Sequence, residues 1–161
     1  MNARVALASL VVWALGCGVL LPDTRTPADR ARELEPKCGG ESVAGTAASL
    51  ANRAIDSVEP YYVTLSSSSG HENRMLGGRL HVRPLPGATA ESLARTLQCH
   101  QAAVVGGSAT AAEDDPYVLP GSWLQIDVAS EGNGFIVSTY PVDFRNGAEA
   151  LERARRFARR R

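Results

Sequence analysis

The amino-acid sequence predicts an α+β fold, an antiparallel four-stranded sheet with helices packed on one face. Strands with alternating polar and apolar residues occur in two parts of the chain. Each of these parts ends in a stretch whose apolar residues have helical spacing. The order strand–strand–helix therefore occurs twice, and helices segregated to one side of an antiparallel sheet are the natural packing of such units.

The first unit follows a helix expected over residues 42–58, where apolar residues recur at helical spacing before Pro60. Residues 61–65 are rich in strand formers and predict the first strand. Residues 66–70 are four serines and a glycine, which are typical of a polar hairpin loop. This unit is therefore expected to begin with a short strand and a solvated loop.

The first unit continues with residues 79–83, which alternate strictly and predict a strand with one buried face. Thr89 then predicts the start of a helix over residues 90–105. Residues 106–121 form the longest irregular stretch after the N-terminal region, and their acidic run predicts a surface loop. The pattern thus closes one strand–strand–helix unit.

The second unit repeats this order. Residues 123–128 alternate again, and Asn133-Gly134 predicts a hairpin turn into a strand over residues 135–140. Asn146, with a glutamate three residues later, predicts a capped helix start. Apolar residues at helical spacing then form the inner stripe of the last helix.

The N-terminus has the order of a secretory signal. Arg4 precedes an uncharged, mostly apolar run over residues 5–15, and a small residue then precedes a cysteine. The segment Ala14-Leu15-Gly16-Cys17 resembles the lipobox of bacterial lipoproteins, in which the cysteine is diacylated and becomes the new N-terminus. The resemblance implies a lipid on Cys17. Because Gly18 rather than Asp follows, it also implies sorting to the outer membrane, on its periplasmic side.

Two other interpretations of the N-terminus stay open. The small-x-small pattern of Ala14 and Gly16 also fits ordinary signal peptidase cleavage, which would release a soluble periplasmic or secreted protein. Alternatively, the seventeen uncharged residues from Val5 to Leu21 would be an uncleaved anchor, although a bilayer span needs about 20 residues. With cleavage, residues 1–16 are a signal peptide, 17–40 an acylated cysteine and tether, and 41–161 one α+β domain.

Composition excludes some partners. Removing sixteen of the 161 residues leaves 145, enough for one domain with a core. Positive and negative residues balance at 17 each, so the loss of Arg4 leaves a net charge of −1. No nucleic acid is therefore expected as a partner, and no motif predicts a cofactor.

The cysteine count predicts one disulfide. The chain has three cysteines, and if Cys17 carries lipid then Cys38 and Cys99 remain. An exported compartment permits disulfides, so these two are expected to pair. A bridge that closes a loop of this length stabilises a fold by about 4 kcal/mol. The alternative is two separate free thiols.

Two patterns suggest chemistry. Cys99 and His100, together with His71 or His81, would offer ligands to a soft metal, but their spacing matches no metal motif. A histidine on an apolar helix stripe is more typical of a packed, hydrogen-bonded core residue. Ser66 near His71 would suit a small hydrolase only if the fold positioned a base, so no catalytic residue is assigned.

One face of the sheet is the best candidate for binding a partner. Strand alternation places a set of polar and aromatic side chains opposite the buried ones. Trp and Arg are enriched where proteins bind partners, and the alternative is a solvated or covered face. The predicted face consists of Arg79, His81, Arg83, Trp123, Gln125 and Asp127.

The last nine residues contain six arginines. Cations suit the C-terminal end of a helix dipole, and contact with anionic lipid is the functional alternative. Together these features predict a lipid-anchored cell-envelope protein with a structural or protein-binding role. A periplasmic metal-binding protein that uses Cys99 and His100 is the alternative, and a small hydrolase is a third.

Overall fold

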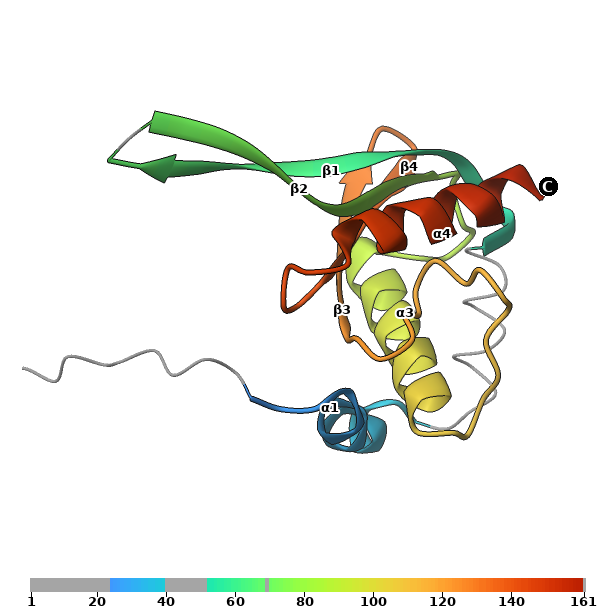
Figure 1. Ribbon diagram of the computed structural model, residues 1–161. Helices are drawn as coiled ribbons and strands as arrows, with labels where there is room; N and C mark the ends of the chain where they lie inside the picture. Colours follow the sequence, from blue (N-terminus) through green and yellow to red (C-terminus); the bar gives the residue numbers. More distant parts are fainter. Residues whose placement is uncertain (1–23, 40–51, 69, 161) are drawn as a thin grey trace, which may run out of the picture.

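A computed structural model describes residues 24–39, 52–68 and 70–160 (Figure 1). The predicted α+β fold with an antiparallel four-stranded sheet is confirmed. No helix in the described part of the chain is long and apolar enough to cross a membrane. The elements are α1 (Pro27–Leu34), the 3₁₀ helix η1 (Glu35–Lys37), β1 (Ile55–Ser67), β2 (Gly70–Val82), α3 (Ala90–Val105), β3 (Leu124–Glu131), β4 (Gly134–Pro141) and α4 (Gly147–Arg159).

The sheet is built from two hairpins in the order β1-β2-β4-β3, and every neighbouring pair is antiparallel. Leu80 of β2 lies opposite Val137 of β4, so the second strand of each hairpin meets in the centre. The outer strands β1 and β3 are consequently the two edges of the sheet.

The core lies on the face that the helices cover. The alternating residues Leu80, Val82, Leu124 and Ile126 are at most 3% exposed, as the sequence pattern predicts. Helix α3 packs along β3, and α4 packs over β2 and β1. At Gly147, where α4 begins, a Cβ atom would lie 2.3 Å from the backbone oxygen of Leu76, so only glycine permits this close contact between helix and strand.

Half of the first hairpin extends beyond the sheet (Figure 1). Strand β2 pairs with β4 only over residues 78–82, whereas it pairs with β1 along its whole length. We call residues 61–67 and 70–77 the arm, because in the described structure these two segments pair only with each other. An isolated two-stranded hairpin is at best marginally stable, so the arm depends on the sheet at its base.

The first hairpin corrects two predictions. The helix expected over residues 42–58 is wrong for residues 55–58, which begin β1; residues 42–51 lie outside the described residues. The loop expected over residues 66–70 is also wrong, because Ser66 pairs with His71 and Ser67 pairs with Gly70. Polar residues on both faces of a ribbon remove the alternation that would reveal a strand, since neither face packs on a core.

Two local details of the second unit also differ from prediction. Glu131 pairs with Gly134, so the hairpin turn is Gly132-Asn133, one residue earlier than expected. Gly132 has φ +54°, as required at the first position of a type II′ turn. Asn146 does precede α4, but its side chain makes no capping hydrogen bond, so the predicted capped start is wrong. By contrast, Thr89 caps α3 as expected.

The N-terminal segment contacts the sheet domain. Helix α1 packs against α3, and the disulfide Cys38–Cys99 joins the chain after η1 to α3 with an S–S distance of 2.05 Å. The predicted pairing of the two cysteines is therefore confirmed. Residues 27–37, which lie in the stretch expected to be a tether, are helical and lie beside α3.

Candidate functional site

The predicted partner-binding face is divided between separated strands. β4 lies between β2 and β3, so Arg79 and Asp127 lie on opposite sides of Ser138 in one row across the sheet. The polar side chains of β2, and Arg83 directly after it, contact carboxylates. Arg79 pairs with Glu59 at 3.2 Å and Arg83 with Asp56 at 3.0 Å, and Nδ1 of His81 lies 3.2 Å from an oxygen of Glu131. Exposed ion pairs of this kind contribute about 0–1 kcal/mol each, but they give both arginines a carboxylate partner within the chain.

Trp123 does not join the cations of β2. It precedes β3 and lines a cavity of about 160 Å³ between this edge of the sheet and α1. Arg30 and Lys37 from the N-terminal segment and Gln98 from α3 line the same cavity. The prediction that Trp123 and Arg83 form one surface therefore lacks support from the geometry, because α1 lies beside the tryptophan.

Aromatic rings gather at the base of the arm. The ring centroids of Tyr61 and Tyr140 are 5.5 Å apart, and those of Tyr140 and Phe144 are 6.4 Å apart and nearly parallel. The Tyr140 hydroxyl donates to Asp127 at 2.8 Å; burial, followed by this hydrogen bond, raises the pKa of Tyr140. Phe144 has φ +54°, an unusual conformation for a bulky residue, and its turn holds the ring outside the core.

Exposed large hydrophobic side chains mark the arm and this turn. Among the described residues they are Tyr62 at 54%, Leu65 at 44% and Phe144 at 48%. Tyr62 and Leu65 lie on the arm, and Phe144 stacks on Tyr140 beside its base. We call these three residues the arm surface. The sequence prediction missed this surface, although the uncharged strand formers at residues 61–65 were a signal for it.

Ser66 and His71 come together near the tip of the arm. Their Oγ and Nδ1 atoms are 3.0 Å apart, and both residues are exposed. A nucleophile and its base need a third group that orients the base. The hydrogen bonds of the described residues provide no carboxylate partner for His71. The pair therefore resembles a cross-strand hydrogen bond rather than a catalytic site.

Cys99 and His100 have structural contacts. The sulfur of Cys99 is in the disulfide, so it is not a free thiolate. Nε2 of His100 lies 2.7 Å from a carboxylate oxygen of Asp115, and both side chains are buried. No group of three metal-ligating side chains occurs among the described residues. This arrangement joins α3 to the loop before β3, as expected for a hydrogen-bonded core histidine.

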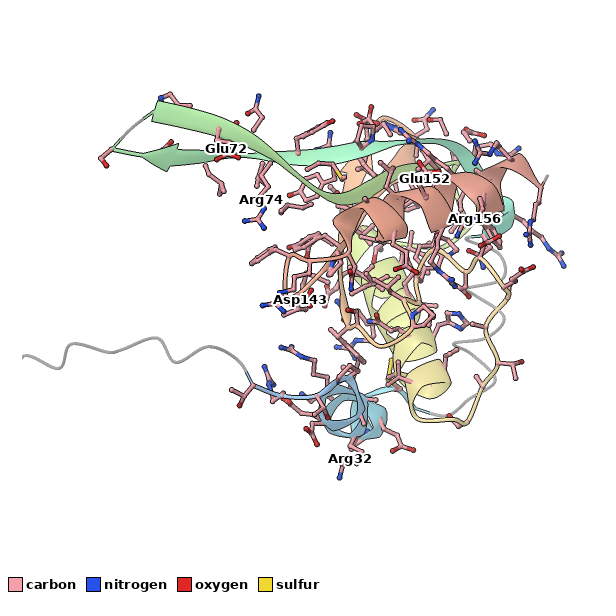
Figure 2. The ribbon with its side chains drawn as sticks, in the orientation of Figure 1. Arg32, Glu72, Arg74, Asp143, Glu152 and Arg156 are labelled. Carbon is pink, nitrogen blue, oxygen red and sulfur yellow. A yellow bond between two sulfur atoms is a disulfide. The ribbon has the colours of Figure 1, made fainter. Side chains whose placement is uncertain are left out.

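The arginine-rich end of α4 contacts the acidic loop. Arg156 donates to Asp114 at 3.0 Å, and Arg160 contacts Glu113 at 2.9 Å and Asp114 at 3.0 Å. Figure 2 shows Arg156 on the part of α4 that lies far from the arm. The Arg156 hydrogen bond lowers the pKa of Asp114 below its ordinary value. These contacts favour the structural interpretation of the arginines, and the lipid contact remains a prediction.

Glutamines of α3 close the β3 edge of the sheet. The buried side chain of Gln101 accepts from the Leu124 N–H at 2.8 Å and donates to the Leu124 carbonyl at 3.0 Å. Gln98 donates to the Ile126 carbonyl at 3.2 Å. The amide of Gln101 thus occupies the position of a peptide group in a neighbouring strand. This function of Gln98 and Gln101 was not predicted from the sequence.

Comparison with known proteins finds no related protein. No protein-family model matches the chain, and neither a curated protein nor a solved structure matches it. Function therefore has to be inferred from the geometry of this chain. Among the surfaces described above, the arm surface combines exposed hydrophobic side chains with a position beyond the sheet.

Proposed function

We propose that this chain is a non-catalytic protein of the bacterial cell envelope, anchored by a lipid on Cys17, that binds a protein partner through the arm surface. One observation carries the binding role. The exposed large hydrophobic side chains of the described residues gather on the arm and beside its base. The lipobox resemblance of Ala14-Leu15-Gly16-Cys17 supports the anchor.

The arm surface has the chemistry of a binding site. The exposed large apolar side chains of the described residues are concentrated on the arm and beside its base, and such concentrations of exposed apolar area mark interaction sites. Burying one large apolar side chain contributes about 1.5–3 kcal/mol. Tyr62 and Phe144 are aromatic, and aromatic residues are enriched in interfaces. A protruding ribbon also permits contact on both of its faces, since Tyr62 and Leu65 point to opposite sides.

The potentially reactive side chains favour a non-catalytic role. Ser66 and His71 are exposed, and among the described residues their side chains are hydrogen-bonded to each other, while Cys99 and His100 hold α3 to neighbouring segments. Enzyme sites instead place such groups in a concave, mostly apolar pocket. The exposed arm therefore fits a binding role, and the buried polar groups fit a role in holding the fold together.

The anchor would keep the domain close to the membrane. Six residues lie between Cys17 and Thr24, where the described structure begins, so seven residue-to-residue steps separate the two. A fully extended chain of this length spans about 25 Å at most. A lipid on Cys17 would therefore place the arm within reach of proteins at the same membrane surface.

Position-specific cross-linking tests the binding role in the full chain. A photoreactive residue at Leu65 is expected to give a discrete adduct in native membranes. The matched control carries it at Ala129, an exposed position on β3. The binding proposal is wrong if both positions give the same adducts or if neither gives one.

Fractionation tests the anchor separately. Cys17→Ser is expected to remove fatty-acid labelling and to shift the protein out of its normal membrane fraction. A wild-type protein that carries no labelled fatty acid and fractionates like the variant would contradict lipid anchoring. This result would leave the arm as a binding site of a soluble protein.

A further inference from the structure

The two edges of the arm differ in their protection. An edge strand presents unpaired N–H and C=O groups, and natural proteins protect such edges with charges, proline or a cover. On the β2 side, Glu72 and Arg74 provide charges on the arm (Figure 2). No described strand pairs with the other side of β1. The β1 edge of the arm is therefore the edge at which a partner strand could pair.

The β1 edge of the arm lacks the usual protection. Residues 61–67, Tyr-Tyr-Val-Thr-Leu-Ser-Ser, contain no charge and no proline. Their aromatic and β-branched side chains favour strands. Exposed, uncharged segments of six or seven such residues are the ones that associate by strand pairing. Two of their side chains, Tyr62 and Leu65, are among the exposed hydrophobic groups of the arm surface.

Backbone geometry shows which groups would pair. Ser67 lies opposite Gly70 across a two-residue connection, which makes them a hydrogen-bonded pair. Alternate residues of β1 then direct their N–H and C=O groups away from β2. Thr64 is one of these residues, and its side chain contacts Asn73 directly across the ribbon at 2.8 Å, as the closer, non-hydrogen-bonded pairs do.

We propose that the β1 edge of the arm pairs, antiparallel and centred on Thr64, with the same segment of a second copy of this chain. This inference rests on the proposed binding role of the arm surface. A two-fold axis through the centre places Thr64 opposite its own copy, Val63 opposite Leu65, and Tyr62 opposite Ser66. Each of these pairs joins residues on the same face. The two arms together form a continuous four-stranded sheet.

Charge favours a second copy as the occupant. A two-fold pair sets a segment against its own copy, so a segment with charges of one sign would bring like charges close together across the two strands. Residues 61–67 have no such conflict. Pairing also covers the exposed Leu65 with Val63 of the other copy. Finally, it converts a two-stranded ribbon, which is marginal alone, into a sheet of four strands.

Complementary charges at Thr64 test the pairing. Two full-length copies with different tags are co-expressed, extracted from membranes and purified through one tag. Wild-type copies are expected to co-purify. Thr64→Glu with itself, and Thr64→Lys with itself, are expected to reduce co-purification several-fold, because like charges lie opposite each other. Thr64→Glu with Thr64→Lys is expected to restore it.

The control and the outcomes separate this inference from the proposed function. Ala129→Glu, which adds a carboxylate to an exposed strand position outside the arm, is expected to leave co-purification unchanged. Equal co-purification in all Thr64 combinations, or no restoration in the mixed pair, overturns self-pairing. If wild-type copies do not co-purify but Leu65 still cross-links to another protein, self-pairing is wrong and the binding role stands. If neither occurs, both are wrong.

Discussion

The two edges of the sheet differ in how far other parts of the chain cover them. At the β3 edge, Gln101 hydrogen-bonds both backbone groups of Leu124, and α1 lies beside Trp123. At the β1 edge, residues 61–67 extend beyond the sheet, and no described strand covers them. One edge is therefore closed by the chain itself, whereas the other presents backbone groups and exposed hydrophobic side chains.

We expect the closed β3 side to determine the stability of the domain and the arm to determine its association. The closed side combines the disulfide, the buried Gln101 and the His100–Asp115 contact, all of which involve α3. A change there leaves buried groups without partners and should destabilise the domain. The arm has few buried contacts, so a change at its exposed positions should affect association far more than folding.

The largest effect on stability is expected from the disulfide. Replacing both Cys38 and Cys99 with alanine should lower the free energy of unfolding by about 4 kcal/mol, because the unfolded chain regains the entropy of an open loop of about 60 residues. Urea unfolding of the full chain measures this. A loss below about 1 kcal/mol would show that the bridge contributes little to the closed side.

The next effect tests the closure of the β3 edge. Gln101→Leu should lower the free energy of unfolding by about 2–4 kcal/mol, since it leaves the N–H and C=O of Leu124 buried without partners. Gln98→Leu is the matched control and should cost only about 1 kcal/mol, because one partly buried hydrogen bond is lost. Equal losses in the two variants would contradict the special position of Gln101.

The features that the sequence predicted most accurately are those that local residue patterns determine. Alternation in residues 79–83 and 123–128 indicated the inward positions, and helix α3 has the bounds expected from its apolar spacing. The disulfide followed from the small number of cysteines. In each case the deciding residues are near one another in the sequence or have only one available partner.

Long-range features could not be predicted in this way. A glutamine on a helix normally indicates a solvated position, and only strand order reveals that Gln101 faces the β3 edge. Alternation assigned the predicted binding face without giving the order of its strands, and in the structure β4 separates β2 from β3. Residues 61–65 of the arm were predicted as a strand, whereas residues 66–70 were predicted as a loop because the outer half of the arm has polar residues on both faces and packs on no core.

A smaller effect concerns acid stability where the acidic loop contacts α4. Because the Arg156 hydrogen bond lowers the pKa of Asp114 in the folded protein, this carboxylate stabilises the fold above the unfolded pKa of about 3.9. That contribution should be lost as the pH falls through the lowered folded value. Asp114→Asn should weaken this pH dependence in thermal melts between about pH 5 and pH 2. An unchanged dependence would contradict the assignment.

The smallest effect on stability is expected on the arm. Leu65→Glu should change the free energy of unfolding by less than about 0.5 kcal/mol, since the side chain is 44% exposed. The same variant should lose most of its association, because it introduces a charge beside the paired strands. A large loss of stability, or unchanged association, would remove the contrast between the two edges.

Hydrogen exchange at the Leu124 and Thr64 amides compares the two edges most directly. In dilute full-length protein, the Leu124 amide should exchange slowly, because Gln101 accepts its hydrogen bond in the core. The Thr64 amide should exchange rapidly when dilute and become protected at concentrations where copies associate. A Thr64 amide as protected as that of Leu124 in dilute protein, or one that stays unprotected when copies associate, would contradict the difference between a closed β3 edge and an open β1 edge.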